Sequence, residues 1–223
     1  MSKLLKSIEA EPLSYLPEQS LPVLWSFLKG YYGRCQMEGQ YQDFGTTFRE
    51  FDNWIKARFQ VKAKALNFID VICSFCETEQ AALLEYFRLL REFEVTHKTT
   101  TRVAECPPTN RLDLIEVIKL LRKDPLGYLG STSFRACYSF LMGDERACID
   151  LSLPKTDDRI LFNDFKGWVE RNKNRALPRP WFKIISFWSG LEDCGHTSRG
   201  AFSLFYTWLD QYAKEIDKPN LFG

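Results

Sequence analysis

Apolar residues recur every three or four positions along most of the chain, which is the spacing that places them on one face of an α-helix. Phe48, Phe51 and Ile55 form one such series. Alternation of apolar and polar residues, the mark of a half-buried strand, is rare. The pattern therefore predicts an all-α protein. Residues 66–75 (LNFIDVICSF) leave a buried helix and a strand open, because the apolar run is too short to decide.

One long stretch of the sequence occurs twice in the chain. Residues 12–35 align with residues 125–148 at an offset of 113, and ten of the 24 positions are identical. The spaced aromatic residues return at an offset of 114 as Phe162, Phe165 and Trp168. Identity at this level in one register indicates an internal repeat. It predicts a tandem duplication of one helical unit, with pseudo-symmetry between the copies.

The copies set the expected domain organisation. Repeat A spans residues 1–105, repeat B spans residues 112–223, and residues 106–111 link them. The wider segment 99–110 carries a Thr run and Pro107-Pro108, and consecutive prolines cannot continue a helix. Each copy has room for about four helices.

Caps mark the expected ends of one helix in each copy. Ser20 and Ser133 stand at equivalent positions where a serine side chain would open a helix. Gly30 and Gly143 stand ten residues later, where a glycine would close it. The residues that follow differ: 143–146 (GDER) replace 30–33 (GYYG), and this departure suggests that the second copy has specialised.

Composition and charge exclude several classes of protein. The 223 residues are 45% hydrophobic and carry a net charge of +1, which gives no whole-molecule attraction to nucleic acid or anionic lipid. Apolar runs stay far below the roughly 20 residues that cross a bilayer. The N-terminus has acidic residues and no apolar core of a signal peptide. Seven scattered cysteines fit a reducing compartment, so the expected location is the cytoplasm.

Candidate chemistry is sparse. Cys73 and Cys76 form the only C-x-x-C pair, and a zinc site needs four ligands, so we expect no metal and no cofactor. Asp193, Cys194 and His196 form the densest group of reactive side chains. They support an alternative interpretation, a small enzyme centred on this loop, although no known catalytic motif accompanies them.

Two segments of the second copy differ most from the first in charge and length. Residues 171–183 carry five basic side chains, and about five extra residues fall within 189–199, where the offset rises to 119. Loops that change on a retained scaffold are where function concentrates. We therefore expect a partner to bind at Arg171, Lys173, Arg175, Arg179, Glu192, Asp193, His196 and Arg199.

The residue types and their spacing within the repeat resemble those of a known group of proteins. The run Pro-x-x-Tyr-Leu, Ser, Phe-Leu-x-Gly-Tyr, then Phe-x-x-Phe-x-x-Trp and Glu-x-x-Ala-Leu, is similar to that of small bacterial proteins encoded beside polymorphic and contact-dependent toxins. The residues that carry the resemblance are Pro12, Tyr15, Leu16, Ser20, Phe27, Leu28, Gly30, Tyr31, Phe48, Phe51, Trp54, Arg58, Phe59, Glu79, Ala82, Phe87, Leu90 and Phe93. In the first copy Pro17 replaces the usual glycine, and in the second Asn172-Lys173 replaces Arg58-Phe59.

The resemblance implies an immunity protein, which binds a cognate toxin domain in the cytosol and blocks it without chemistry of its own. Its expected partner is a protein; a membrane is not expected, and nucleic acid is disfavoured by the balanced charge. A helical adaptor that joins other proteins is a further alternative, and the enzyme centred on His196 is the other.

Overall fold

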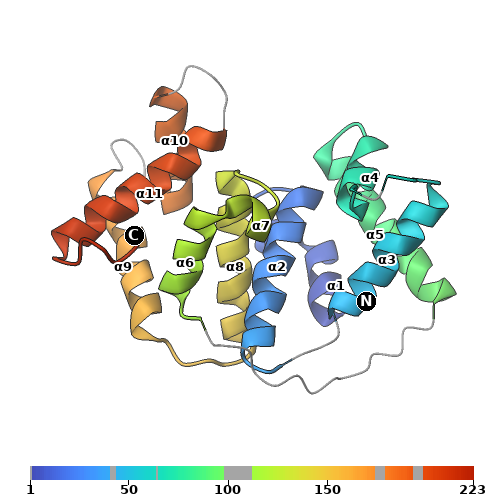
Figure 1. Ribbon diagram of the computed structural model, residues 1–223, viewed down its shortest axis with the longest axis horizontal. Helices are drawn as coiled ribbons and strands as arrows, with labels where there is room; N and C mark the ends of the chain where they lie inside the picture. The colour runs from blue at the N-terminus through green and yellow to red at the C-terminus, as the bar shows by residue number, and fades with distance from the viewer. Residues whose placement is uncertain (1, 41–43, 64, 98–111, 174–178, 193–197) are drawn as a thin grey trace. The chain divides into compact units, whose positions relative to one another are not determined.

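The computed structural model describes residues 2–40, 44–63, 65–97, 112–173, 179–192 and 198–223. In this part of the chain all regular secondary structure is helical, with eleven α-helices and one 3₁₀ helix, so the all-α prediction is confirmed (Figure 1). The predicted linker, residues 106–111, lies outside the described residues. The chain divides into two compact units: unit 1 comprises Met1–Thr109 and Leu141–Ala147, and unit 2 comprises Asn110–Phe140 and Cys148–Gly223.

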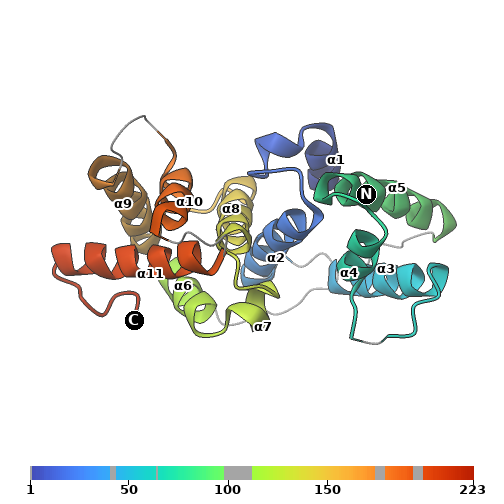
Figure 2. The ribbon, with the colours of Figure 1, turned by 90° about the horizontal axis from the view of Figure 1, so that it is seen from above.

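Unit 1 is built from five α-helices and the 3₁₀ helix. The helix α5 packs against α2, α3 and α4, and α3 lies beside α4 (Figure 2). The elements are α1 (Lys3–Ala10), η1 (Pro12–Ser14), α2 (Leu21–Met37), α3 (Phe44–Arg58), α4 (Phe68–Ser74) and α5 (Glu79–Thr96). The ambiguous segment 66–75 is therefore helical, and Asn67 caps it by accepting from the backbone N–H of Ile69 and Asp70.

Unit 2 contains six α-helices, one of them divided between the units. The helix α11 packs against α9 and α10, and α6 packs against α9 (Figure 2). The elements are α6 (Leu114–Lys123), α7 (Pro125–Leu129), α8 (Phe134–Asp150), α9 (Asp157–Asn172), α10 (Trp181–Glu192) and α11 (Ser198–Glu215). Both copies hold more helices than the four expected, because short helices such as α4 and α7 give too little periodicity to be counted from sequence.

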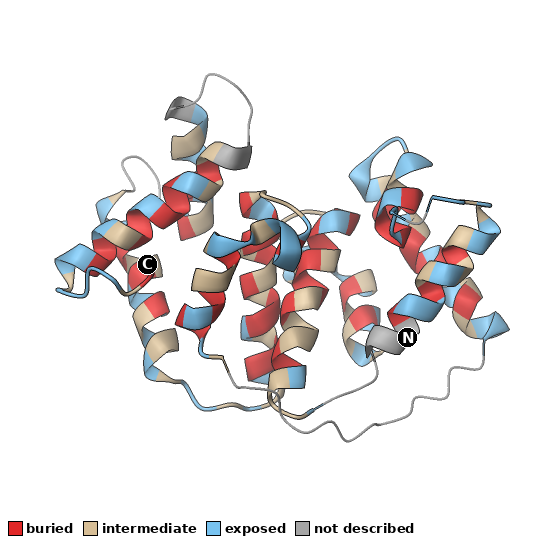
Figure 3. Ribbon diagram, in the orientation of Figure 1, coloured by how far each residue is buried: buried red, intermediate tan, exposed pale blue. Residues whose placement is uncertain are grey.

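Buried residues occupy the inward faces of the helices, and exposed residues occupy the others (Figure 3). In unit 1 the fully buried ring of Phe51 is the centre of the aromatic core. Its centroid lies 5.3 Å from that of Phe68 on α4, and 5.8 and 5.5 Å from those of Tyr86 and Phe93 on α5. Such ring contacts at 4.5–7 Å stabilise a core beyond the area that they bury.

The same contacts recur in unit 2 at the offsets of the repeat. The Phe165 centroid lies 6.2 Å from that of Trp181 on α10, and 5.9 and 5.7 Å from those of Phe205 and Tyr212 on α11. These partners stand 113, 119 and 119 residues after those of Phe51. The matched contacts support the predicted tandem duplication and explain why aromatic residues occupy these positions twice.

The predicted ending of two helices at glycine is wrong. Ser20 does cap α2, accepting from the Val23 N–H at 3.4 Å. Yet Gly30 lies inside α2 and Gly143 lies inside α8. Within unit 1, a Cβ at Gly143 would lie 1.9 Å from the carbonyl oxygen of Phe27, so glycine is there to let two backbones approach.

Two of the residues that differ at 143–146 make contacts within unit 1. Asp144 is buried in unit 1, where its Oδ1 accepts from Arg34 Nε at 2.8 Å. The Arg146 guanidinium lies 5.4 Å from the ring centroid of Tyr15. Asp144 thus stands at the repeat position of Tyr31 and Arg146 at that of Gly33, and both make contacts within unit 1, while Glu145 at the position of Tyr32 is exposed.

Candidate functional site

The predicted partner-binding residues fall near the ends of three helices of unit 2. Arg171 lies in the last turn of α9, Lys173 is its C-cap, and Arg179 precedes α10. Glu192 ends α10, and Arg199 is the second residue of α11. The other predicted site residues, Arg175, Asp193 and His196, lie outside the described residues, as does Cys194.

Helix endings explain why the basic residues stand where they do. The Lys173 N–H donates to the Val169 carbonyl at 2.9 Å and closes α9, and a cation there interacts favourably with the negative end of the helix dipole. The helix α10 then begins at Trp181, whose N–H donates to Glu170 Oε1 of α9 at 3.1 Å. The start of α10 is thus held against α9.

Two tryptophans and an amide surround the ammonium group of Lys173. Its Nζ lies 4.9 Å from the ring centroid of Trp168 and 5.5 Å from that of Trp208, both within cation–π range. It also donates to Gln211 Oε1 at 3.2 Å. Among the described residues Lys173 forms no ion pair, so its charge is held in place by neutral groups.

An aromatic pair on α10 connects Lys173 with Arg179. Trp188 Nε1 donates to the Lys173 carbonyl at 2.8 Å, and the Phe187 and Trp188 centroids lie 6.1 Å apart. The Arg179 guanidinium lies 5.1 Å from the Phe187 centroid, and Phe187 is 48% exposed. We name Lys173, Arg179, Phe187, Trp188 and Gln211 the cationic–aromatic face.

This face brings two of the predicted site residues together and approaches a third. Glu192 follows Trp188 by four residues, about 6 Å of helix rise. Arg171 is exposed but runs back along α9: a Cβ at Gly167 would lie 2.9 Å from Arg171 Nη1. No contact among the described residues joins Arg171 to the face.

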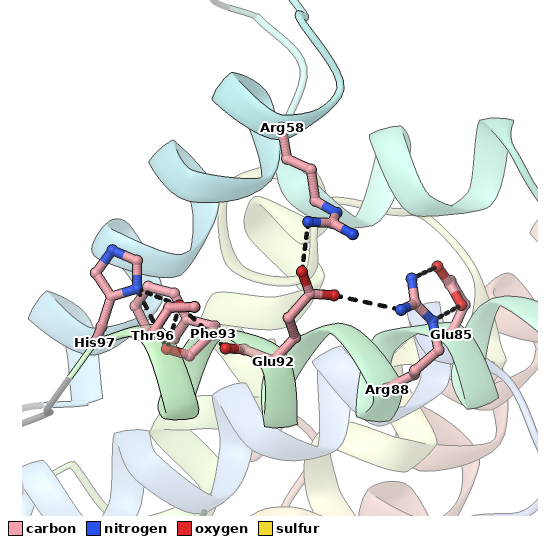
Figure 4. Close-up of polar contacts among 7 residues, drawn as sticks. All are labelled: Arg58, Glu85, Arg88, Glu92, Phe93, Thr96 and His97. Atoms are coloured by element: carbon pink, nitrogen blue, oxygen red, sulfur yellow. Dashed lines mark hydrogen bonds and ion pairs between the residues drawn. The ribbon is translucent and has the colours of Figure 1, made fainter.

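In unit 1 the equivalent tryptophan, Trp54, also has a cation over its ring, but that cation is Arg58, one repeat position before the equivalent of Lys173, and its charge is paired. The Arg58 guanidinium lies 5.3 Å from the Trp54 centroid, and its Nη1 donates to Glu92 Oε1 at 2.5 Å. Glu92 Oε2 accepts from Arg88 at 3.3 Å, and Arg88 pairs in turn with Glu85 (Figure 4). Hydrogen bonding to Glu85 raises the pKa of Arg88, and Arg88 lowers the pKa of Glu85.

Substitutions at the repeat offset remove this pairing from unit 2. Gln211 stands 119 residues after Glu92, and Thr207 stands 119 residues after Arg88. Sequence reasoning found the basic segment but missed Gln211, Phe187 and Trp188. The exchange of an acid for an amide between equivalent positions of the two copies was the signal that identifies Gln211.

Other candidate chemistry gives no site in the described part of the chain. Burial raises the pKa of Cys73 to about 11 and raises that of Cys76, so both thiols stay protonated and weakly nucleophilic at neutral pH. No cluster of three or more His, Cys, Asp or Glu side chains is placed to hold a metal ion among these residues. None of the described helices has both the length and the apolar character that crossing a bilayer requires.

The comparisons with known proteins gave no match: no family model, no curated protein and no solved structure matched the chain.

Proposed function

We propose that this chain is an immunity protein that binds a cognate toxin domain in the cytosol through the cationic–aromatic face of unit 2, without chemistry of its own. The observation that carries the proposal is the contrast between Lys173, which contacts neutral Gln211, and Arg58, which is paired with Glu92. A duplicated scaffold retains its packing, while one copy presents a charge that the other neutralises. The resemblance of the repeat to toxin-associated proteins supports the same proposal.

The composition of the face suits a protein partner. Aromatic residues and arginines supply most of the binding energy at protein interfaces, and cations at the rim accelerate association with an acidic partner. Phe187 and Trp188 provide the aromatic surface, with Lys173 and Arg179 on either side of it. The face lies over the aromatic core of unit 2, since Trp168 contacts both Lys173 and Phe165. Little side-chain ordering is therefore needed on binding.

The test uses the full chain and the toxin domain encoded by a neighbouring gene. We expect cells that produce the toxin domain to survive when they also produce this chain, and the two purified proteins to form a complex in titration calorimetry. A double variant, Lys173→Glu with Arg179→Glu, should protect less well, while Lys6→Glu with Lys62→Glu, at exposed positions of unit 1, should protect fully. Absence of both protection and binding by the native chain would contradict the proposal.

A further inference from the structure

Within the described part of the chain, the surroundings of Lys173 resemble a charge pair from which the acid is missing. In unit 1 a cation lies over Trp54 and a carboxylate, that of Glu92, contacts it from α5. In unit 2 a cation lies over Trp168, and Gln211 of α11 occupies the position of that carboxylate. An amide accepts a hydrogen bond from an ammonium group but does not neutralise its charge.

We infer that the partner supplies a carboxylate to Lys173, in the role that Glu92 performs for Arg58 within unit 1. The Lys173–Gln211 hydrogen bond is solvent-exposed, so an incoming carboxylate can reach the ammonium group. Arg179 offers a second cation beside the exposed ring of Phe187. The partner segment is therefore a protein segment in which acidic side chains flank an apolar one. This inference rests on the proposed function and names the chemistry of its partner.

The same contacts disfavour nucleic acid as the occupant. A base needs an open aromatic face on which to stack. Trp168 and Trp208 are only 5% and 6% exposed, and Lys173 lies over both rings. One face of the Phe187 ring is occupied by Arg179, although the side chain is 48% exposed. The cations remain accessible while these aromatic faces are already occupied, and this combination favours a carboxylate over a stacked base.

The test restores the missing acid. The substitution Gln211→Glu places a carboxylate where the amide now accepts from Lys173, so it should neutralise Lys173 within the chain. The control is Asn163→Asp, which makes the same change in charge at an exposed position of α9 ten residues before Lys173, roughly 15 Å along the helix. Both variants leave the buried core unchanged, and circular dichroism checks that both are folded.

Two probes are titrated into each full-length variant: a fluorescent poly-glutamate peptide and the toxin domain from the neighbouring gene. We expect Gln211→Glu to weaken binding of both probes about fivefold, the factor that corresponds to one exposed ion pair, and Asn163→Asp to change neither by more than a small fraction. A single-stranded RNA of similar charge should bind weakly and with equal affinity to both variants.

The outcomes separate this inference from the proposed function. If the toxin domain binds all variants equally tightly, the carboxylate inference is overturned and the proposed function stands. If the toxin domain does not bind at all while poly-glutamate binding falls only in Gln211→Glu, the proposed function fails and the acid-binding face remains. Tight RNA binding that Gln211→Glu weakens more than poly-glutamate binding would overturn the inference in favour of nucleic acid.

Discussion

Arg34 Nε donates to Asp144 Oδ1 at 2.8 Å inside unit 1, although the two residues are 110 positions apart in the sequence. Both side chains are only 4% exposed, so the pair is removed from solvent on every side. Arg34 also lies 3.5 Å from Glu38 through Nη1. A buried charge pair of this kind joins the short segment Leu141–Ala147 of α8 to α2, and its integrity becomes a condition for the stability of unit 1.

We expect Asp144→Ala to lower the free energy of unfolding by about 3–5 kcal/mol, because it removes the shorter of the two ion pairs of the buried Arg34 and leaves only the 3.5 Å contact with Glu38. The control is Arg88→Ala on the surface of α5, where exposed pairs contribute about 0–1 kcal/mol. Urea denaturation followed by tryptophan fluorescence measures both. Similar losses in the two variants would show that the Arg34–Asp144 pair is not effectively buried.

Gly143→Ala should also destabilise unit 1. The added Cβ would meet the Phe27 carbonyl oxygen at 1.9 Å, and a backbone atom cannot rotate away as a side chain can. Gly33→Ala within α2 is the matched control, because a Cβ there has no neighbour within 4 Å. That variant should gain about 0.5–1 kcal/mol from the better helix propensity of alanine. A loss at Gly33 or a gain at Gly143 in thermal denaturation would contradict the expected packing.

The apolar periodicity predicted the helices well because each one buries a single face, but the prediction that helices end at Gly30 and Gly143 was wrong. Gly143 lets the backbone of α8 approach α2 closely. This contact joins residues far apart in the chain, so the local sequence does not reveal it. The short helix α4 was ambiguous for a different reason. Its seven residues bury Phe68, Ile69, Val71 and Ile72 but make only about two turns, which is too short for a helical period to be read from the sequence.

The two repeat tryptophans should differ in their contribution to stability. Trp168 is 5% exposed and its Nε1 donates to Glu215 at 2.7 Å, whereas Trp54 is only partly buried. We expect Trp168→Ala to cost about 3–5 kcal/mol and Trp54→Ala clearly less. Chemical denaturation of both variants gives the comparison, and a larger loss at Trp54 would contradict it.

Alkaline conditions should destabilise unit 1 through Cys73. Burial raises the pKa of its thiol from 9.0 to about 11, with Glu79 nearby acting in the same direction. The unfolded chain releases this proton first, so the stabilising contribution is complete below pH 9.0 and is lost as the pH rises through about 11. We expect Cys73→Ala to lose less stability than the native chain across this range in urea denaturation. Equal alkaline losses in the two proteins would exclude Cys73 as a cause.

The candidate site was only partly accessible from sequence. Lys173 and Arg179 were found because they lie in a dense run of basic residues. Phe187 and Trp188 belong to the apolar segment 181–188, whose composition is typical of a buried core. Only the contact of Trp188 with the Lys173 carbonyl places this pair beside the cations. Gln211 carries no charge, and its exchange for Glu92 at the repeat offset gains meaning only with the contact between Glu92 and Arg58.

Association with the toxin domain should depend on salt through the cationic–aromatic face. The test reverses two charges of this face with Lys173→Glu and Arg179→Glu, and leaves out Arg175 because it lies outside the described residues. The control, Lys6→Glu with Lys62→Glu in unit 1, makes the same change in net charge. At low ionic strength the first pair should slow association about tenfold, because opposite charges at the rim steer the encounter. The difference should vanish in about 1 M salt, where the screening length falls to roughly 3 Å. Stopped-flow fluorescence measures these rates.

Equal slowing by both pairs would mean that net charge alone governs the encounter, and greater slowing by the unit 1 pair would place the binding face there. Because Lys173 also lies over Trp168 and Trp208, urea denaturation of both double variants checks that each is folded under the assay conditions, which keeps a kinetic effect distinct from unfolding.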